Sequence, residues 1–157
     1  MLAGLKHLKA LALLLAISAC ASPVAAQIPN GDTLRVLALR VSQLELDRQL
    51  RSATSATIDS LLSLYADSVV YEHPNAGAII RGKTELRHGM MQFIGSIRAV
   101  RASPPQVTVG NGVALVETRT QMEVENAGKW IAVLRHGVRV LEFDRQFRIR
   151  RIIDYPW

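Results

Sequence analysis

The chain has 157 residues, 49% of them hydrophobic, with 19 Lys and Arg, 13 Asp and Glu and a single Cys. This length predicts one domain of ordinary size, and the apolar fraction is too high for a disordered chain. A single cysteine excludes an internal disulfide framework and a Cys-rich zinc site. The formal net charge of +6 is compatible with a nucleic-acid or membrane partner. Whether it indicates such a partner depends on how the basic residues are distributed along the chain.

The N-terminus, residues 1–26, has the pattern of a secretory signal peptide. Two lysines precede an apolar stretch over residues 10–17, which is too short for a transmembrane helix, and small residues follow it. Residues 24–26 (VAA) fit a signal peptidase site, whereas residues 17–20 (ISAC) resemble a bacterial lipobox in which Cys20 is lipidated. We therefore expect an exported protein, periplasmic or secreted, that is either free or lipid-anchored at Cys20.

Removal of this segment takes away two lysines and no acid, so the formal charge of +6 falls by two. The remaining basic residues are scattered, except for a group near the C-terminus that consists of Arg145, Arg148, Arg150 and Arg151. These lie on a predicted strand, where alternate side chains point to opposite faces. No nucleic-acid-binding motif accompanies them, so we expect no nucleic-acid partner, and a membrane contact only through the signal or the lipid anchor.

Three helices are predicted in the first part of the domain. The first is capped by Asp32 or Thr33 and carries apolar residues at helical spacing as far as Leu50. The second begins near Ser55 and includes Tyr65 in its apolar stripe. The third follows Gly82, and its apolar positions are Leu86, Met90, Phe93, Ile94 and Ile97.

Strand patterns surround the third helix. Residues 69–71 have β character and end at Pro74, and Ile79-Ile80 form a short return strand. Further along, the Asn111-Gly112 step predicts a tight hairpin. Long strands are predicted over residues 113–124 and 129–144, with a turn at 126–128 between them and a final strand over 147–155. Gly137, inside the second long strand, predicts a bulge or a bend.

This order predicts an α+β fold in one domain over residues 32–157, after a linker at 27–31. Helices that are segregated from a meander of antiparallel strands are typical of this class. Long, bent strands favour a strongly curved antiparallel sheet wrapped around the three N-terminal helices. Such a cone leaves a concave space in which a small ligand can bind.

Three stretches resemble the nuclear transport factor 2-like superfamily, in its SnoaL-like branch. They are residues 64–74 (LYADSVVYEHP), 137–144 (GVRVLEFD) and 148–155 (RIRRIIDY), and the likeness covers roughly residues 32–157. The resemblance implies a cystatin-like α+β roll. The superfamily includes ketosteroid isomerases, polyketide cyclases, limonene epoxide hydrolases and non-enzymatic binding or assembly domains, so the fold alone does not select a function.

Polar side chains on three predicted strands are candidates for a site in the cone. Tyr71 and His73 are two residues apart on one strand and therefore share a face. His73 is the candidate base, because imidazole exchanges protons near neutral pH. Asp154 would orient His73, or act as an acid if burial raised its pKa. The predicted catalytic residues are His73 and Asp154, and the predicted substrate-binding residues are Tyr71, Arg119, Gln121 and Glu117.

The resemblance adds residue correspondences to this site. The segment that holds the general base of ketosteroid isomerases is similar to Glu72-His73-Pro74, while their oxyanion Tyr has no counterpart in residues 46–50 and their acidic oxyanion partner falls near Arg139. The water-binding Tyr and Asn of limonene epoxide hydrolases resemble Tyr71 and His73. Their Arg-x-Asp pair resembles Arg119-Thr120-Gln121, where Gln121 replaces one carboxylate, and their last acid resembles Asp154.

Two functions follow as hypotheses. The first is the binding of a small, largely apolar molecule in the cone, with acid–base isomerase, cyclase or lyase activity. The alternative is a non-catalytic ligand-binding or assembly module of the cell envelope. We expect no cofactor and no metal, since no ligand cluster has metal-binding spacing. A homodimer through the sheet, common among the relatives, is also expected.

Overall fold

The computed structural model describes residues 30–156, which form three α-helices and seven strands. The helices are α1 (Gly31–Asp47), α2 (Ser55–Leu62) and α3 (Lys83–Gln92). The strands are β1 (Tyr65–His73), β2 (Ala78–Arg81), β3 (Ile97–Ala102), β4 (Gln106–Gly110), β5 (Val113–Asn126), β6 (Lys129–Phe143) and β7 (Ile149–Pro156). The predicted α+β class is confirmed.

The strands form one open sheet in the order β2-β1-β7-β6-β5-β3, and β4 pairs with the other half of β5. Neighbours are antiparallel except for β1 and β7, which run parallel. The sheet is therefore mixed, whereas the sequence predicted a wholly antiparallel one. The reason is connectivity: hairpins force β4, β5 and β6 to alternate in direction, but β1 and β7 are far apart in the chain and no hairpin constrains their direction.

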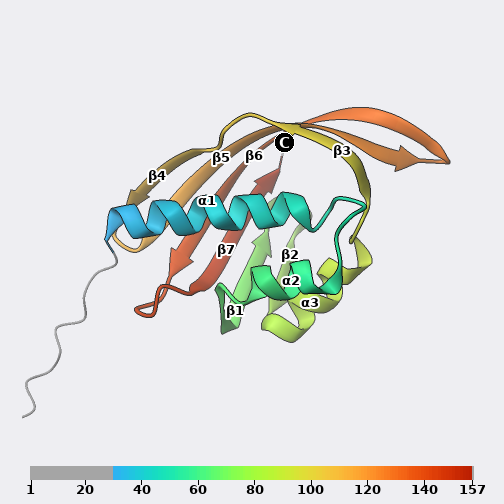
Figure 1. Ribbon diagram of the computed structural model, residues 1–157. Helices are drawn as coiled ribbons and strands as arrows, with labels where there is room; N and C mark the ends of the chain where they lie inside the picture. The colour runs from blue at the N-terminus through green and yellow to red at the C-terminus, as the bar shows by residue number, and fades with distance from the viewer. Residues whose placement is uncertain (1–29, 157) are drawn as a thin grey trace, which may run out of the picture.

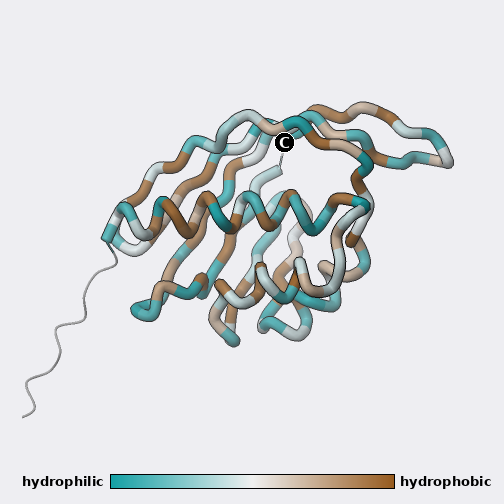
Figure 2. The backbone as a smooth tube through the Cα atoms, in the orientation of Figure 1, coloured by the Kyte–Doolittle hydropathy of each residue, from teal (hydrophilic) through white to brown (hydrophobic). Residues whose placement is uncertain are grey.

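The core lies between α1 and the concave face of the sheet. Figure 1 shows α1 lying across this face, with α2 and α3 at one end. Leu34, Ala38 and Val41 of α1 are fully buried, as are Val116 of β5 and Leu141 of β6. Figure 2 shows apolar positions alternating with polar ones along the strands, as a sheet with one covered face requires.

Both predicted hairpin turns are confirmed. Gly110 pairs with Val113 across Asn111-Gly112, whose φ angles of 49° and 77° suit a two-residue turn. The turn at 127–128 connects β5 and β6 in the same way. The bulge predicted as one option at Gly137 is absent from the β5–β6 ladder, which passes Gly137 without a register shift. Gly137 instead pairs with Pro156, where β7 ends.

Three element boundaries differ from the sequence prediction. The side chain of Asn30, rather than of Asp32 or Thr33, caps α1 by accepting a hydrogen bond from the backbone N–H of Asp32. Tyr65 begins β1 instead of ending the second helix. The third helix ends at Gln92, because Gly95 with a φ of 70° breaks the helical path, and the following residues form β3. No helix within residues 30–156 is long and apolar enough to cross a membrane.

Candidate functional site

A cavity of about 610 Å³ lies inside the cone, between the C-terminal part of α1, helix α3 and the concave face of the sheet. Most of its wall is apolar, and its main apolar side chains are Ile80, Leu86, Met90, Phe93, Ile97 and Met122. Tyr71, His73 and Asp154 line the same cavity. The structure therefore brings together three of the residues that the sequence placed in one site.

Tyr71 and Asp154 meet at the polar end of the cavity. The hydroxyl of Tyr71 donates a hydrogen bond of 2.7 Å to Oδ2 of Asp154. Nη2 of Arg139, on β6, donates to the same oxygen at 2.9 Å. This contact follows from register, because Arg139 is the direct cross-strand partner of Asp154, and both face inward. The carboxylate thus has two donors from two neighbouring strands.

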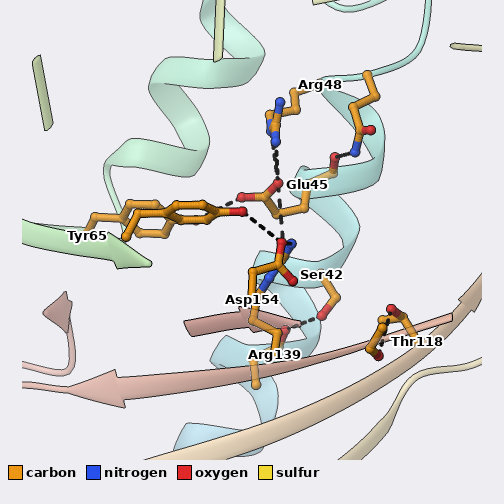
Figure 3. A network of polar contacts seen from close by, with 11 residues as sticks. Ser42, Glu45, Arg48, Tyr65, Thr118, Arg139 and Asp154 are labelled. Atoms are coloured by element: carbon orange, nitrogen blue, oxygen red, sulfur yellow. Dashed lines mark hydrogen bonds and ion pairs between the residues drawn. The ribbon is translucent and has the colours of Figure 1, made fainter. Parts of the chain in front are cut away.

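A second carboxylate, Glu45, reaches the same place from α1. Oε2 of Glu45 lies 2.8 Å from Nη2 of Arg48 and 4.0 Å from Nη1 of Arg139, and Oε1 accepts a 3.1 Å hydrogen bond from the hydroxyl of Tyr65. Only 4% of Glu45 is exposed. Figure 3 shows Arg48 and Tyr65 converging on Glu45, with Arg139 next to Asp154. Arg139 therefore connects two carboxylates through one partly buried guanidinium.

Electrostatics fix the protonation of this cluster. Burial acts to raise the pKa of Glu45, but Arg48 and Arg139 outweigh it, and the net pKa is lowered. The pKa of Asp154 is lowered in the same way, against burial, by Arg139 and by the hydrogen bond from Tyr71. Burial and the adjacent Asp154 raise the pKa of Tyr71, so its phenol stays neutral. Asp154 is a carboxylate at neutral pH, and the predicted option of a protonated acid is not supported.

His73 lies beside this cluster without a hydrogen bond to it. Its ring centroid is 6.2 Å from that of Tyr71. Nδ1 of His73 is buried and has no hydrogen-bond partner among the described residues. A buried polar atom without a partner is costly, and a bound molecule that forms a hydrogen bond with it would remove this cost. His73 is thus the titratable group of the polar end whose hydrogen-bonding capacity is least used.

The other three predicted substrate-binding residues lie elsewhere. Glu117, Arg119 and Gln121 alternate with the inward-facing residues of β5 and point to the outer face of the sheet. There Nη2 of Arg119 lies 3.0 Å from Oε1 of Glu117, and Nε2 of His136 lies 3.1 Å from the same oxygen. This corrects the expectation that they share the cone with His73. The buried Ala114 and Val116 set the phase of β5, so the even-numbered residues face the cavity side.

The site predicted from the sequence lacked Glu45, Arg48 and Tyr65 and gave Arg139 no role. One signal was present for Glu45, which continues the helical stripe of Leu34, Ala38 and Val41 and so places a carboxylate on the core-facing side. Arg139 likewise shares a face of β6 with the buried Leu141 and Phe143, at a spacing of two residues. A charge in phase with core positions is the pattern that marks both residues.

The described residues contain no group of three or more His, Cys, Asp or Glu that could hold a metal ion. The signal peptide, both cleavage-site alternatives and the lipidation of Cys20 fall outside the described residues 30–156.

The buried carboxylates predict an acid dependence of stability. Folding lowers the pKa values of Glu45 and Asp154. The two carboxylates therefore stabilise the folded state at any pH above their pKa values in the unfolded chain, which are near 4. This stabilisation is lost as the pH falls through the lower pKa values of the folded state. We expect the free energy of unfolding to fall below about pH 5, and less steeply in a Glu45→Gln/Asp154→Asn variant. Urea denaturation at several pH values measures this, with the exposed Glu85→Gln as control. An equal slope in the double variant would contradict the assignment.

Comparison with known proteins identifies the fold and the family of the chain. A curved sheet that encloses a cavity against three helices is the cone-shaped fold of nuclear transport factor 2-like proteins. The model of the SnoaL-like domain family matches residues 46–152, and the chain belongs to this family. No curated protein matches the chain significantly.

Three solved structures illustrate the likeness. A Shewanella denitrificans protein, provisionally described as a SnoaL-like polyketide cyclase, is 15% identical with a TM-score of 0.58 over 75% of this chain and 90% of that one. An LEH-like epoxide hydrolase of M. tuberculosis is 18% identical, with a TM-score of 0.56 over 78% and 84%. A Kribbella flavida protein, provisionally described as a ketosteroid isomerase, is 17% identical, with a TM-score of 0.57 over 81% and 79%. Identities this low establish a shared fold only.

Proposed function

We propose that this protein binds a small, largely apolar molecule in the cone and transfers a proton to or from it through His73. The observation that carries the proposal is the pairing of an apolar cavity of about 610 Å³ with Tyr71, His73 and Asp154 at one end. Apolar walls with a few converging polar groups are typical of small-molecule sites. The reaction class is a cofactor-independent isomerisation, cyclisation or elimination, in line with the isomerase, cyclase and epoxide hydrolase described among structures of this fold.

In this proposal the polar groups have separate roles. His73 accepts the proton, because Asp154 already accepts two hydrogen bonds and has a lowered pKa, which makes it a weak base. Arg139 holds Asp154 in place, and Asp154 in turn fixes the hydroxyl of Tyr71.

Ligand binding is tested with 2-naphthol, which joins an apolar body to one hydroxyl donor. We expect it to bind about five- to ten-fold more tightly than 2-methoxynaphthalene, the contribution of one net hydrogen bond. His73→Phe should abolish this preference, whereas His88→Phe, on the exposed face of α3, should keep it. Fluorescence titration measures the affinity of each of the three proteins for both compounds. Equal affinity of the native protein for both compounds, or no binding of either, would refute the proposed role of His73 as the polar contact.

A second candidate is a binding module without catalysis. The favouring observation is that Tyr71 and Arg139 hold Asp154, and that Arg48 holds Glu45, as groups with a structural role do. This function predicts 2-naphthol binding without proton transfer to carbon. The two candidates therefore differ in turnover and not in affinity.

We also propose export, supported by the signal-peptide pattern of residues 1–26, and a homodimer through the sheet. Leu115 and Tyr155, on the outer face, are 42% and 37% exposed, which supports a partner on that side.

A further inference from the structure

Arg135, on β6, stands out among the charged residues of the cavity wall. It is exposed and lines the cavity of about 610 Å³ at the sheet edge, where β6 continues past the end of β7. Within residues 30–156, its side chain has no hydrogen bond or ion pair. Arg48 and Arg139, the other arginines of the wall, are both paired with carboxylates. Arg135 is therefore the free cation of the described wall.

The acids of the region do not neutralise Arg135. Glu45 and Asp154 are bound to Arg48 and Arg139, and Glu117 contacts Arg119 and His136 on the outer face. Glu125, the remaining acid of the wall, is five residues along β5 from Thr120, the register partner of Arg135. This spacing is about 17 Å along a strand. No acidic side chain among the described residues of this region therefore neutralises the guanidinium of Arg135.

A second hollow strengthens the positive potential there. A depression of about 640 Å³ beside β3, β5 and β6 is also lined by Arg135, together with Arg101 and Arg119. Arg101, like Arg135, is exposed and has no ion pair within residues 30–156. Arg135 thus lies between an apolar cavity and a basic depression. A molecule whose apolar part occupies the first would place its other end against the guanidinium.

We infer that the ligand carries an anionic oxygen group, a carboxylate or a phosphate, that Arg135 binds while the apolar body lies in the cavity. This inference rests on the proposed ligand binding and specifies its substrate class. A planar guanidinium matches either anion with two parallel hydrogen bonds. Arg135 and Arg139 are four residues apart on β6, which is about 13 Å along the strand. Arg139 lies at the polar end of the cavity, so a ligand hydroxyl bound at that end and an anionic group bound by Arg135 must lie at opposite ends of the ligand.

The test compares 2-naphthol with 6-hydroxy-2-naphthoate and 6-hydroxy-2-naphthyl phosphate by isothermal titration calorimetry. At low salt we expect at least one anion to bind about ten-fold more tightly than 2-naphthol, the difference between the two anions identifying the preferred group. Arg135→Gln should remove this gain, so that the anions bind no more tightly than 2-naphthol does. Arg145→Gln is the matched control: Arg145 is exposed, carries the same charge and does not line the cavity.

The possible outcomes separate the anion inference from the proposed ligand binding. If 2-naphthol binds and neither anion binds more tightly, the anion inference is wrong while the proposed function stands. Equal losses in Arg135→Gln and Arg145→Gln would assign the gain to overall charge and overturn the role of Arg135. If the native protein binds none of the three probes, the ligand-binding proposal fails and the inference fails with it.

Discussion

Replacing Arg139 with methionine is expected to lower the free energy of unfolding by about 3 to 5 kcal/mol, because removal of one partner leaves buried charges uncompensated. Arg139 contacts Asp154 at 2.9 Å and lies 4.0 Å from Glu45. The methionine has a similar volume but leaves both carboxylates facing an apolar group. Urea denaturation measures the loss, and a Glu45→Gln/Asp154→Asn pair added to Arg139→Met should recover part of it.

The control uses the same substitution in an exposed ion pair. Arg148 lies 3.1 Å from Asp144 and its side chain is 44% exposed, so Arg148→Met should cost less than about 1 kcal/mol. Similar losses in the two variants would show that the Arg139 cluster adds no more than a surface pair. A large loss confined to Arg139→Met would identify the cluster as the polar centre of the core.

The order of elements could be predicted because local patterns determine it. Helical spacing of apolar residues located α1 and α2, and the Asn111-Gly112 step located the first long hairpin. The direction of β1 relative to β7 could not be obtained in this way, because it depends on contacts between segments far apart in the sequence. The start of β3 was missed for a related reason: Ile97 and Val100 fit a helical stripe as well as a strand until Gly95 is recognised as the break.

The candidate site was predictable in part. Tyr71, His73 and Asp154 were found because β1 and the end of β7 carry polar residues among apolar ones. The error on β5 arose from its phase: Glu117, Arg119 and Gln121 share a face with one another, but the strand turns that face outward. A shift of one residue moves a whole row of side chains to the other face of the sheet. The presence of reactive side chains in a strand therefore does not show which face of the sheet they occupy. The buried Ala114 and Val116 would have been the better guide.

Proton transfer by His73 leads to the largest expected change in activity. Nitrobenzisoxazole reports on any base in an apolar site: the base removes the carbon-bound proton, the N–O bond breaks, and a coloured cyanonitrophenolate is released with no other reactant. We expect the native protein to accelerate this elimination and His73→Gln to lower the rate by about 100-fold or more, the usual contribution of a positioned base. Stopped-flow absorbance measures the rate.

The controls separate a base from a structural histidine. His88→Gln removes an exposed imidazole of α3 and should leave the rate unchanged. Asp154 contacts Tyr71 and Arg139 rather than the reacting proton, so Tyr71→Phe should reduce the rate less than His73→Gln does. If His73→Gln retained the native rate, His73 would not be the base. If the native protein bound 2-naphthol yet gave no elimination, the non-catalytic binding module would be the correct function, because the cavity would then recognise a ligand without offering its protons an acceptor.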